Sequence, residues 1–139
     1  MLDHSAAMLA FIKLAGVAQS KRQLSQRDKF LLLAAAAAVE SGFDPVADRC
    51  RHLLLKHNSV HMVRRFESVA HALADPEYQS FQRQLSRFCS YERAEHYLTQ
   101  LGIAPGLPAM HAKLDVGEYA LLLLGRGAAS ESAGDTPHG

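Results

Sequence analysis

The chain has 139 residues, of which 48% are hydrophobic and 21% are charged, values typical of one ordinary globular domain and not of a disordered chain. Alanine and leucine dominate, tryptophan is absent, and the β-branched residues are sparse, so helices are favoured over a sheet. The net charge of +1 is too small to indicate a nucleic-acid or membrane partner by itself.

The first apolar segment, residues 6–18, could be mistaken for a signal peptide or a membrane span. Asp3 precedes it, no Lys or Arg does, and Lys13 interrupts it. A secretory signal has the opposite arrangement of charge, and a membrane span needs about 18 uninterrupted apolar residues. We therefore expect a helix over about residues 5–18, in a cytoplasmic protein with no membrane partner.

The second apolar segment, residues 30–39, has no polar residue on any side. A helix of this kind is usually surrounded by other helices. Ser25 and Asp28 have the spacing of a capping box before it, and Ser41-Gly42 is a typical helix stop after it. These signals predict a central helix over about residues 26–41.

Two further helices are expected to begin at Asp44-Pro45 and Asp75-Pro76. In each dipeptide the Asp can cap the helix, and the Pro suits the first helical position because its missing N–H would be unpaired there. Helical apolar spacing then continues over about residues 45–57 and 76–89. Whether the two segments are a true repeat stays open.

The remaining helices are predicted from apolar spacing and from one cap. Met62, Phe66, Val69 and Leu73 indicate a helix over residues 60–74, and Ser90 caps another over residues 91–101 that Gly102 ends. An alternation of apolar and polar residues, which would indicate a strand, is nowhere sustained.

The fold class is therefore all-α, a single compact domain of about six short-to-medium helices around the central Ala/Leu-rich helix. It is an orthogonal bundle or a set of stacked helical hairpins. The helical domain spans residues 1–124, with a core of 5–104 and a C-terminal extension of 105–124 in which residues 118–124 form a short docking helix. Residues 125–139 are small, polar and glycine-rich, which predicts a disordered tail.

The strongest local bias is basic. Residues 49–66 contain five Lys or Arg, three His and no acidic residue. The outline of helix, short turn and helix allows a helix-turn-helix protein that binds nucleic acid or another anion, with residues 59–71 as the recognition helix. The turn lacks the expected glycine, however, and the charge is low for a polyanion-binding domain. The candidate surface for an anion or a partner consists of Arg49, Arg51, Lys56, His61, Arg64 and Arg65.

A weaker alternative is a metal site at His57 and His61, which would share one face of a continuous helix. Zinc needs at least a third protein ligand, and Asn58 occupies the position where the HExxH motif has its glutamate. Asn58-Ser59 also favours a helix stop and restart, which would separate the two imidazoles. We therefore predict no metal and no cofactor.

Function is assigned by elimination. Cys50 and Cys89 stand far apart and fall on or next to apolar stripes, so we expect reduced, packed thiols. The sequence has no Gly-rich phosphate loop and no GxSxG motif. We therefore expect a non-enzymatic protein–protein interaction module whose partner is another protein. The module could also form a homo-oligomer. We expect the protein to come from a bacterial source.

Overall fold

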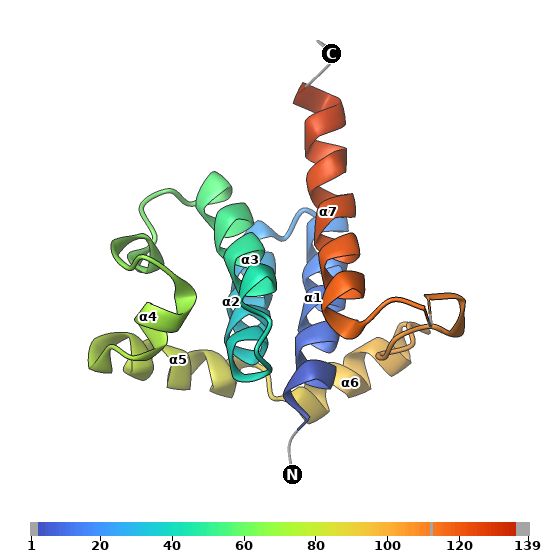
Figure 1. Cartoon of the computed structure of the whole chain (residues 1–139), viewed down its shortest axis with the longest axis horizontal. Coiled ribbons are helices and arrows are strands. Elements are labelled where there is room, and N and C mark those ends of the chain that lie inside the picture. The colour runs from blue at the N-terminus through green and yellow to red at the C-terminus, as the bar shows by residue number, and fades with distance from the viewer. Residues whose placement is uncertain (1–2, 112, 136–139) are drawn as a thin grey trace.

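The computed structural model describes residues 3–111 and 113–135, with side chains up to Gly125 apart from that of residue 110. In this part of the chain every regular element is a helix, so the predicted all-α fold is confirmed, and no helix combines the length and apolar character needed to cross a membrane. The α-helices, joined by two short 3₁₀ helices (η1, Met62–Arg65; η2, Ala109–His111), are α1 (His4–Ser20), α2 (Leu24–Glu40), α3 (Asp44–His57), α4 (Val69–Leu73), α5 (Pro76–Phe88), α6 (Tyr91–Gln100) and α7 (Val116–Asp135) (Figure 1).

Helix α2 lies at the centre of the bundle, as its sequence predicts. It contacts α1, α3, α4 and α5, and Ala34, Ala35 and Ala38 are fully buried along it. Its small side chains let the neighbouring helices approach closely on several sides. Figure 1 shows α4 and α5 on one side of this centre and α6 and α7 on the other.

Three of the connections between helices end in the same way, with one residue in the left-handed backbone region. Gly42 (φ 82°) and Gly102 (φ 74°) occupy this position after α2 and α6, as predicted, and Arg22 (φ 59°) occupies it after α1. In all three turns the next backbone N–H donates to a carbonyl of the last helical turn, for example Phe43 N to Ala38 O at 2.8 Å. This geometry satisfies carbonyls that the helix end leaves unpaired.

The predicted N-caps are confirmed for two helices and wrong for two others. Asp75 accepts from Tyr78 N at 3.1 Å and Ser90 accepts from Arg93 N at 3.2 Å, so α5 and α6 begin where the sequence predicts. Helices α2 and α3 instead follow Gln23 and Phe43, whose side chains make no capping bond. The carbonyls of these two residues still accept from the first turns, from Arg27 N at 2.9 Å and from Val46 N at 3.0 Å.

The continuous helix predicted over residues 60–74 is wrong. The chain forms η1 at Met62–Arg65, passes through extended backbone at Phe66, and begins α4 only after Ser68, which caps it by accepting from His71 N. Val69 of the predicted stripe is fully buried, and Met62, Phe66 and Leu73 are partly buried against the core. Val63 and Ala72, which lie outside that stripe, are also fully buried.

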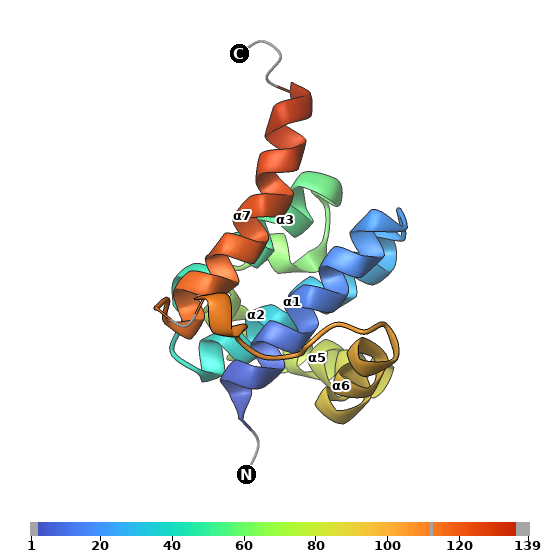
Figure 2. The same cartoon turned by 90° about the vertical axis from the view of Figure 1, so that its right-hand side faces the viewer.

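Helix α7 packs against α1 and α3 and buries Tyr119, Ala120 and Leu124. Asp115 and Glu118 cap each other's backbone N–H groups at 2.7 and 3.0 Å, and Gly117 lies so close to the Phe43 ring that an added Cβ would be 2.7 Å from a ring carbon. The helix contains the predicted short helix at 118–124 and continues to Asp135, projecting beyond the other helices in Figures 1 and 2. The predicted domain boundary after residue 124 stays a prediction, and residues 136–139 lie outside the described residues.

The left-handed conformation of Arg22 leads to a stability prediction. A side chain with a Cβ is disfavoured in this region by about 1–2 kcal/mol, whereas glycine is not. We expect Arg22→Gly to raise the free energy of unfolding by up to about 1 kcal/mol, since the greater freedom of glycine in the unfolded chain offsets part of the relief. Urea unfolding measures this change, and a destabilised variant would contradict it.

Candidate functional site

Two of the basic residues of the candidate surface, Arg51 and Arg64, hold the irregular segment that follows α3. Arg51 donates to Phe66 O at 2.8 Å and to Arg64 O at 3.4 Å, while Arg64 donates to Ser59 O at 3.3 Å. These bonds satisfy carbonyls that a continuous helix would have paired within itself. They explain why residues 60–74 do not form one helix, and the outline of a recognition helix over residues 59–71 is absent.

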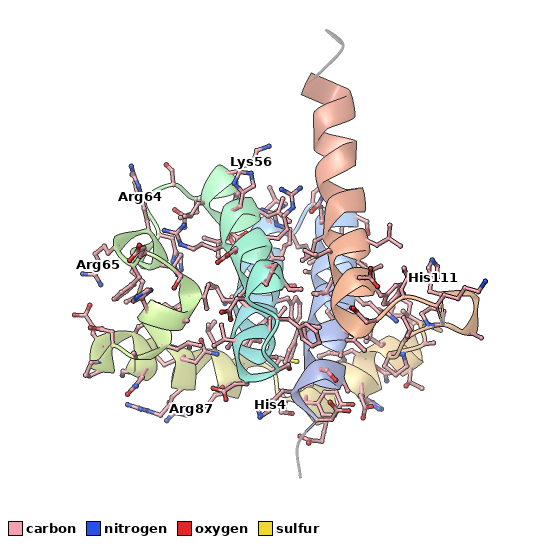
Figure 3. All side chains as sticks on the ribbon, viewed as in Figure 1. His4, Lys56, Arg64, Arg65, Arg87 and His111 are labelled. Atoms are coloured by element: carbon pink, nitrogen blue, oxygen red, sulfur yellow. The ribbon has the colours of Figure 1, made fainter. Side chains whose placement is uncertain are left out.

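The other members of the surface are spread along the same side of the molecule. Arg65 pairs with Glu77 at 2.6 Å, with both side chains more than half exposed (59% and 68%), which contributes little to stability. Arg49 is half-buried and Lys56 is exposed. Figure 3 shows Lys56, Arg64 and Arg65 pointing outward at the edge of the molecule away from His111. The structure therefore disperses this cluster instead of directing it at one point.

His57 and His61 do not form the pair that their spacing suggested. Helix α3 ends at His57, as Asn58 predicted, and His57 Nδ1 lies 2.7 Å from Asp28 Oδ2. His61 instead precedes η1 and accepts from Val63 N at 3.0 Å through its own Nδ1. Within the residues that the structure describes, no group of three or more His, Cys, Asp or Glu could hold a metal ion.

The role of His61 as an acceptor leads to a prediction about pH. Burial lowers the pKa of His61 below its usual 6.5, and Asp28 offsets only part of this effect. The unfolded chain therefore takes up a proton more readily than the folded chain, so stability is lost as the pH falls below about 6.5. Protonation of Nδ1 also removes the bond from Val63 N.

His61→Asn keeps an acceptor at this cap and cannot titrate. We expect its free energy of unfolding to fall less than that of the wild type between pH 7.5 and pH 5, as measured by urea unfolding. The two proteins are identical at every other position, so the difference between them reports His61. Equal losses in the two proteins would show that His61 contributes nothing to the pH dependence.

A buried charged cluster lies beneath the basic segment and was missed by the sequence analysis. Arg27 and Asp28 are only 3% and 8% exposed, and Arg27 Nη2 lies 3.1 Å from Asp28 Oδ1. Arg27 also donates to Gln19 Oε1 and Leu53 O at 3.1 and 3.3 Å. The cluster joins α1, α2 and α3. Arg27 and Asp28 are neighbours in sequence, but their partners Gln19, Leu53 and His57 lie on other helices, so no local spacing reveals that the pair is buried.

Removing one charge of this cluster should be far more costly than removing both. Asp28→Ala removes the carboxylate that lies 3.1 Å from the buried Arg27 guanidinium, and we expect the free energy of unfolding to fall by about 3–5 kcal/mol. The double variant Arg27→Met/Asp28→Leu replaces the pair by apolar side chains and should recover most of that loss. Chemical denaturation compares the two, and a double variant as unstable as the single one would contradict the argument.

The two cysteines are free and packed in the interior, as predicted. Cys50 is fully buried, and burial raises the pKa of its thiol to about 12. Burial also raises the pKa of Cys89. Because the thiolate is the reactive form of cysteine, neither side chain is suited to nucleophilic chemistry.

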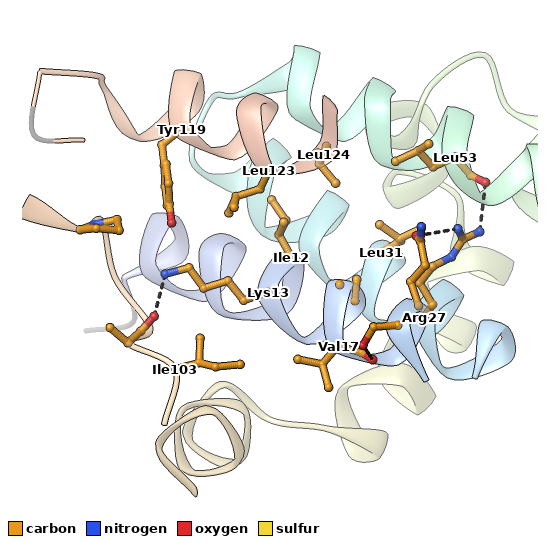
Figure 4. A pocket seen from close by; sticks show the side chains of 16 residues that line it. Ile12, Lys13, Val17, Arg27, Leu31, Leu53, Ile103, Tyr119, Leu123 and Leu124 are labelled. Carbon is orange, nitrogen blue, oxygen red and sulfur yellow. Dashed lines mark hydrogen bonds between the residues drawn. The ribbon is translucent and has the colours of Figure 1, made fainter. Parts of the chain in front are cut away.

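Two hollows flank the C-terminal half of α1, and both were missed from sequence. The first, here called the α1–α7 groove, has a volume of about 740 Å³, and Figure 4 shows Tyr119, Leu123 and Leu124 projecting into it from α7 toward α1. Its polar side chains are Lys13, Gln19, Ser20 and Arg27, and its apolar lining includes Ile12, Val17, Leu31, Leu53, Ile103, Tyr119, Leu123 and Leu124.

The second hollow, here called the α1–α6 hollow, has a volume of about 370 Å³ and shares Val17 with the groove. Its rim carries Tyr97 and Leu101, which are 41% and 48% exposed. Its apolar lining consists of Leu14, Val17, Ala18, Phe30, Phe88, Cys89, Tyr97 and Leu101, and its polar lining of Lys21, Gln23, Gln26 and Gln100. Neither hollow is lined by a carboxylate.

Comparisons with protein-family models, with curated proteins and with solved structures found no match to this chain. Function is therefore inferred from the geometry of these surfaces. Their composition, with apolar walls and a few cationic or amide groups, is typical of binding sites.

Proposed function

We propose that this protein is a non-enzymatic module that binds another protein through the α1–α6 hollow. The observation that carries the proposal is the exposure of Tyr97 and Leu101, two large apolar side chains at the rim of an apolar hollow. Tyr97 lies on α6, and Leu101, four residues later, is the C-cap residue and keeps a helical backbone conformation, so the two side chains share one face. Burial against a partner would remove both from water.

The floor of the hollow suits an apolar anchor. Phe30 and Phe88 pack with ring centroids 5.4 Å apart, and Leu14 and Ala18 of α1 are buried beside them. Aromatic side chains are enriched where proteins bind one another, and buried anchors in preformed pockets supply most of the binding energy. A side chain inserted between Tyr97 and Val17 would meet apolar atoms on several sides.

The charge around the hollow indicates the chemistry of the partner. Lys21 and the amides of Gln23, Gln26 and Gln100 supply hydrogen-bond donors, and no carboxylate lines the hollow. A partner with apolar anchors flanked by Asp or Glu complements this arrangement. An amphipathic helix presents both on adjacent faces, so we propose that the partner contributes such a helix.

The basic surface of residues 49–65 lies elsewhere and provides the competing hypothesis. Arg64 and Arg65 are exposed, so the segment stays an alternative site for an acidic partner or a nucleic acid. The free, buried cysteines support a reducing compartment, and we propose that the protein works in the cytoplasm of a bacterial cell.

Selection of helical peptides from a displayed library tests the proposal. We expect the enriched peptides to be amphipathic with Asp or Glu beside apolar anchors. The double variant Tyr97→Ser/Leu101→Ser should raise the Kd of these peptides by at least about tenfold in fluorescence anisotropy. Light scattering on the protein alone measures its oligomeric state, and so tests whether a second copy of this chain is the occupant of the hollow instead.

Two matched variants serve as controls. Leu121→Ser/Leu122→Ser removes two leucines of comparable exposure, 38% each, on α7 outside the hollow, and should change the Kd less than twofold. Arg64→Glu/Arg65→Glu tests the basic surface. The proposal fails if no such peptide is enriched, or if the arginine variant abolishes binding while the Tyr97/Leu101 variant does not.

A further inference from the structure

The α1–α7 groove has an ammonium group, that of Lys13, at one part of a mainly apolar wall. Lys13 Nζ lies 5.4 Å from the centroid of the Tyr119 ring and donates to Ala104 O and Gly106 O at 2.7 and 2.6 Å. Figure 4 shows it between α1 and the segment that contains Ile103. These contacts position the charge at the groove.

We propose that the α1–α7 groove binds a small amphiphilic carboxylate, a molecule such as a fatty acid with one carboxylate and an apolar chain. The chain would lie between α1 and α7, against Val17, Leu123 and Leu124, and the carboxylate would pair with Lys13. This site is separate from the proposed partner interface and does not depend on it.

Lys13 is suited to this role because its positive charge has no counterion among the residues whose side chains the structure describes. An ammonium has three N–H donors, and two of them serve the carbonyls of Ala104 and Gly106. Among the residues described by the structure, no carboxylate forms an ion pair with it. Partial burial lowers the pKa of Lys13, because it removes water from the charged ammonium. A ligand carboxylate that accepts from the third N–H would compensate for this lost hydration.

The other cation of the groove does not compete for the ligand. The Arg27 guanidinium is directed at Asp28, Gln19 and Leu53 O and is 3% exposed. Among the described residues that line the groove, the Lys13 ammonium is therefore the one cation that faces the ligand, which matches a ligand with a single carboxylate. A phosphate or another multiply charged anion would instead face the carbonyl oxygens of Ala104 and Gly106 and a mainly apolar wall, which disfavours it.

The size and lining of the groove agree with a ligand of this class. Its volume of about 740 Å³ falls within the range of about 300–1,000 Å³ typical of small-molecule sites, which are mostly apolar with a few polar groups. Gly16 contributes open space, since a Cβ built there meets no atom within 4 Å. A glycine inside a helix is unfavourable relative to alanine, and an open groove wall accounts for its presence.

Isothermal titration calorimetry with dodecanoate, dodecan-1-ol and dodecylamine, below their micelle concentrations, tests the head group on the unaltered protein. We expect dodecanoate to bind at least about tenfold more tightly than the alcohol, and the amine to bind more weakly than both. Equal affinities for dodecanoate and dodecylamine, or no binding of dodecanoate, would overturn the proposal.

Variants then locate the site. Gly16→Leu should fill the groove and weaken dodecanoate binding at least about tenfold, whereas the matched control Gly16→Ala should bind within twofold of the wild type and melt at a higher temperature.

Lys13→Met should remove the preference for dodecanoate over the alcohol, and Lys13→Arg should retain it. The Tyr97→Ser/Leu101→Ser variant should bind dodecanoate normally, which separates this site from the protein interface. Dodecanoate binding that is unaffected by Gly16→Leu would place the ligand elsewhere.

Discussion

The structure depends on one constraint: the central stretch of α2 is apolar on every side and must be covered on every side. Helices α1, α3, α4 and α5 supply that cover. Because α1 is itself apolar over most of its surface, it needs cover in turn, and α6 and α7 supply it. This second layer is incomplete along the C-terminal half of α1. The groove and the hollow are the two gaps, and Val17 lies between them.

The helices that local signals determine could be predicted from the sequence. Asp75 and Ser90 cap their own helices, Gly42 and Gly102 end theirs, and each of these signals acts within a few residues. The segment at residues 60–74 could not be predicted, because Arg51, on the preceding helix, binds the carbonyls of Arg64 and Phe66. Apolar spacing alone contains no information about a long-range hydrogen bond of this kind.

The candidate sites were less predictable than the fold. The basic bias of residues 49–66 is real, but an arginine that binds backbone carbonyls looks the same in sequence as one that binds a ligand. The buried cluster joins Asp28 to His57, and the groove joins Lys13 to Tyr119. Such sites arise only when distant helices pack. The one local sign of the groove was Lys13 interrupting an apolar segment, which the sequence analysis used only to exclude a signal peptide.

The central claim is that the incompletely covered side of α1, and not the basic segment, is the binding surface. Backbone amide chemical shifts recorded by NMR during a titration with dodecanoate test it most directly. The account predicts shifts at residues 12–20, 103–108 and 119–124, with residues 49–66 largely unchanged. Shifts concentrated at residues 49–66, or spread evenly over the chain, would contradict it.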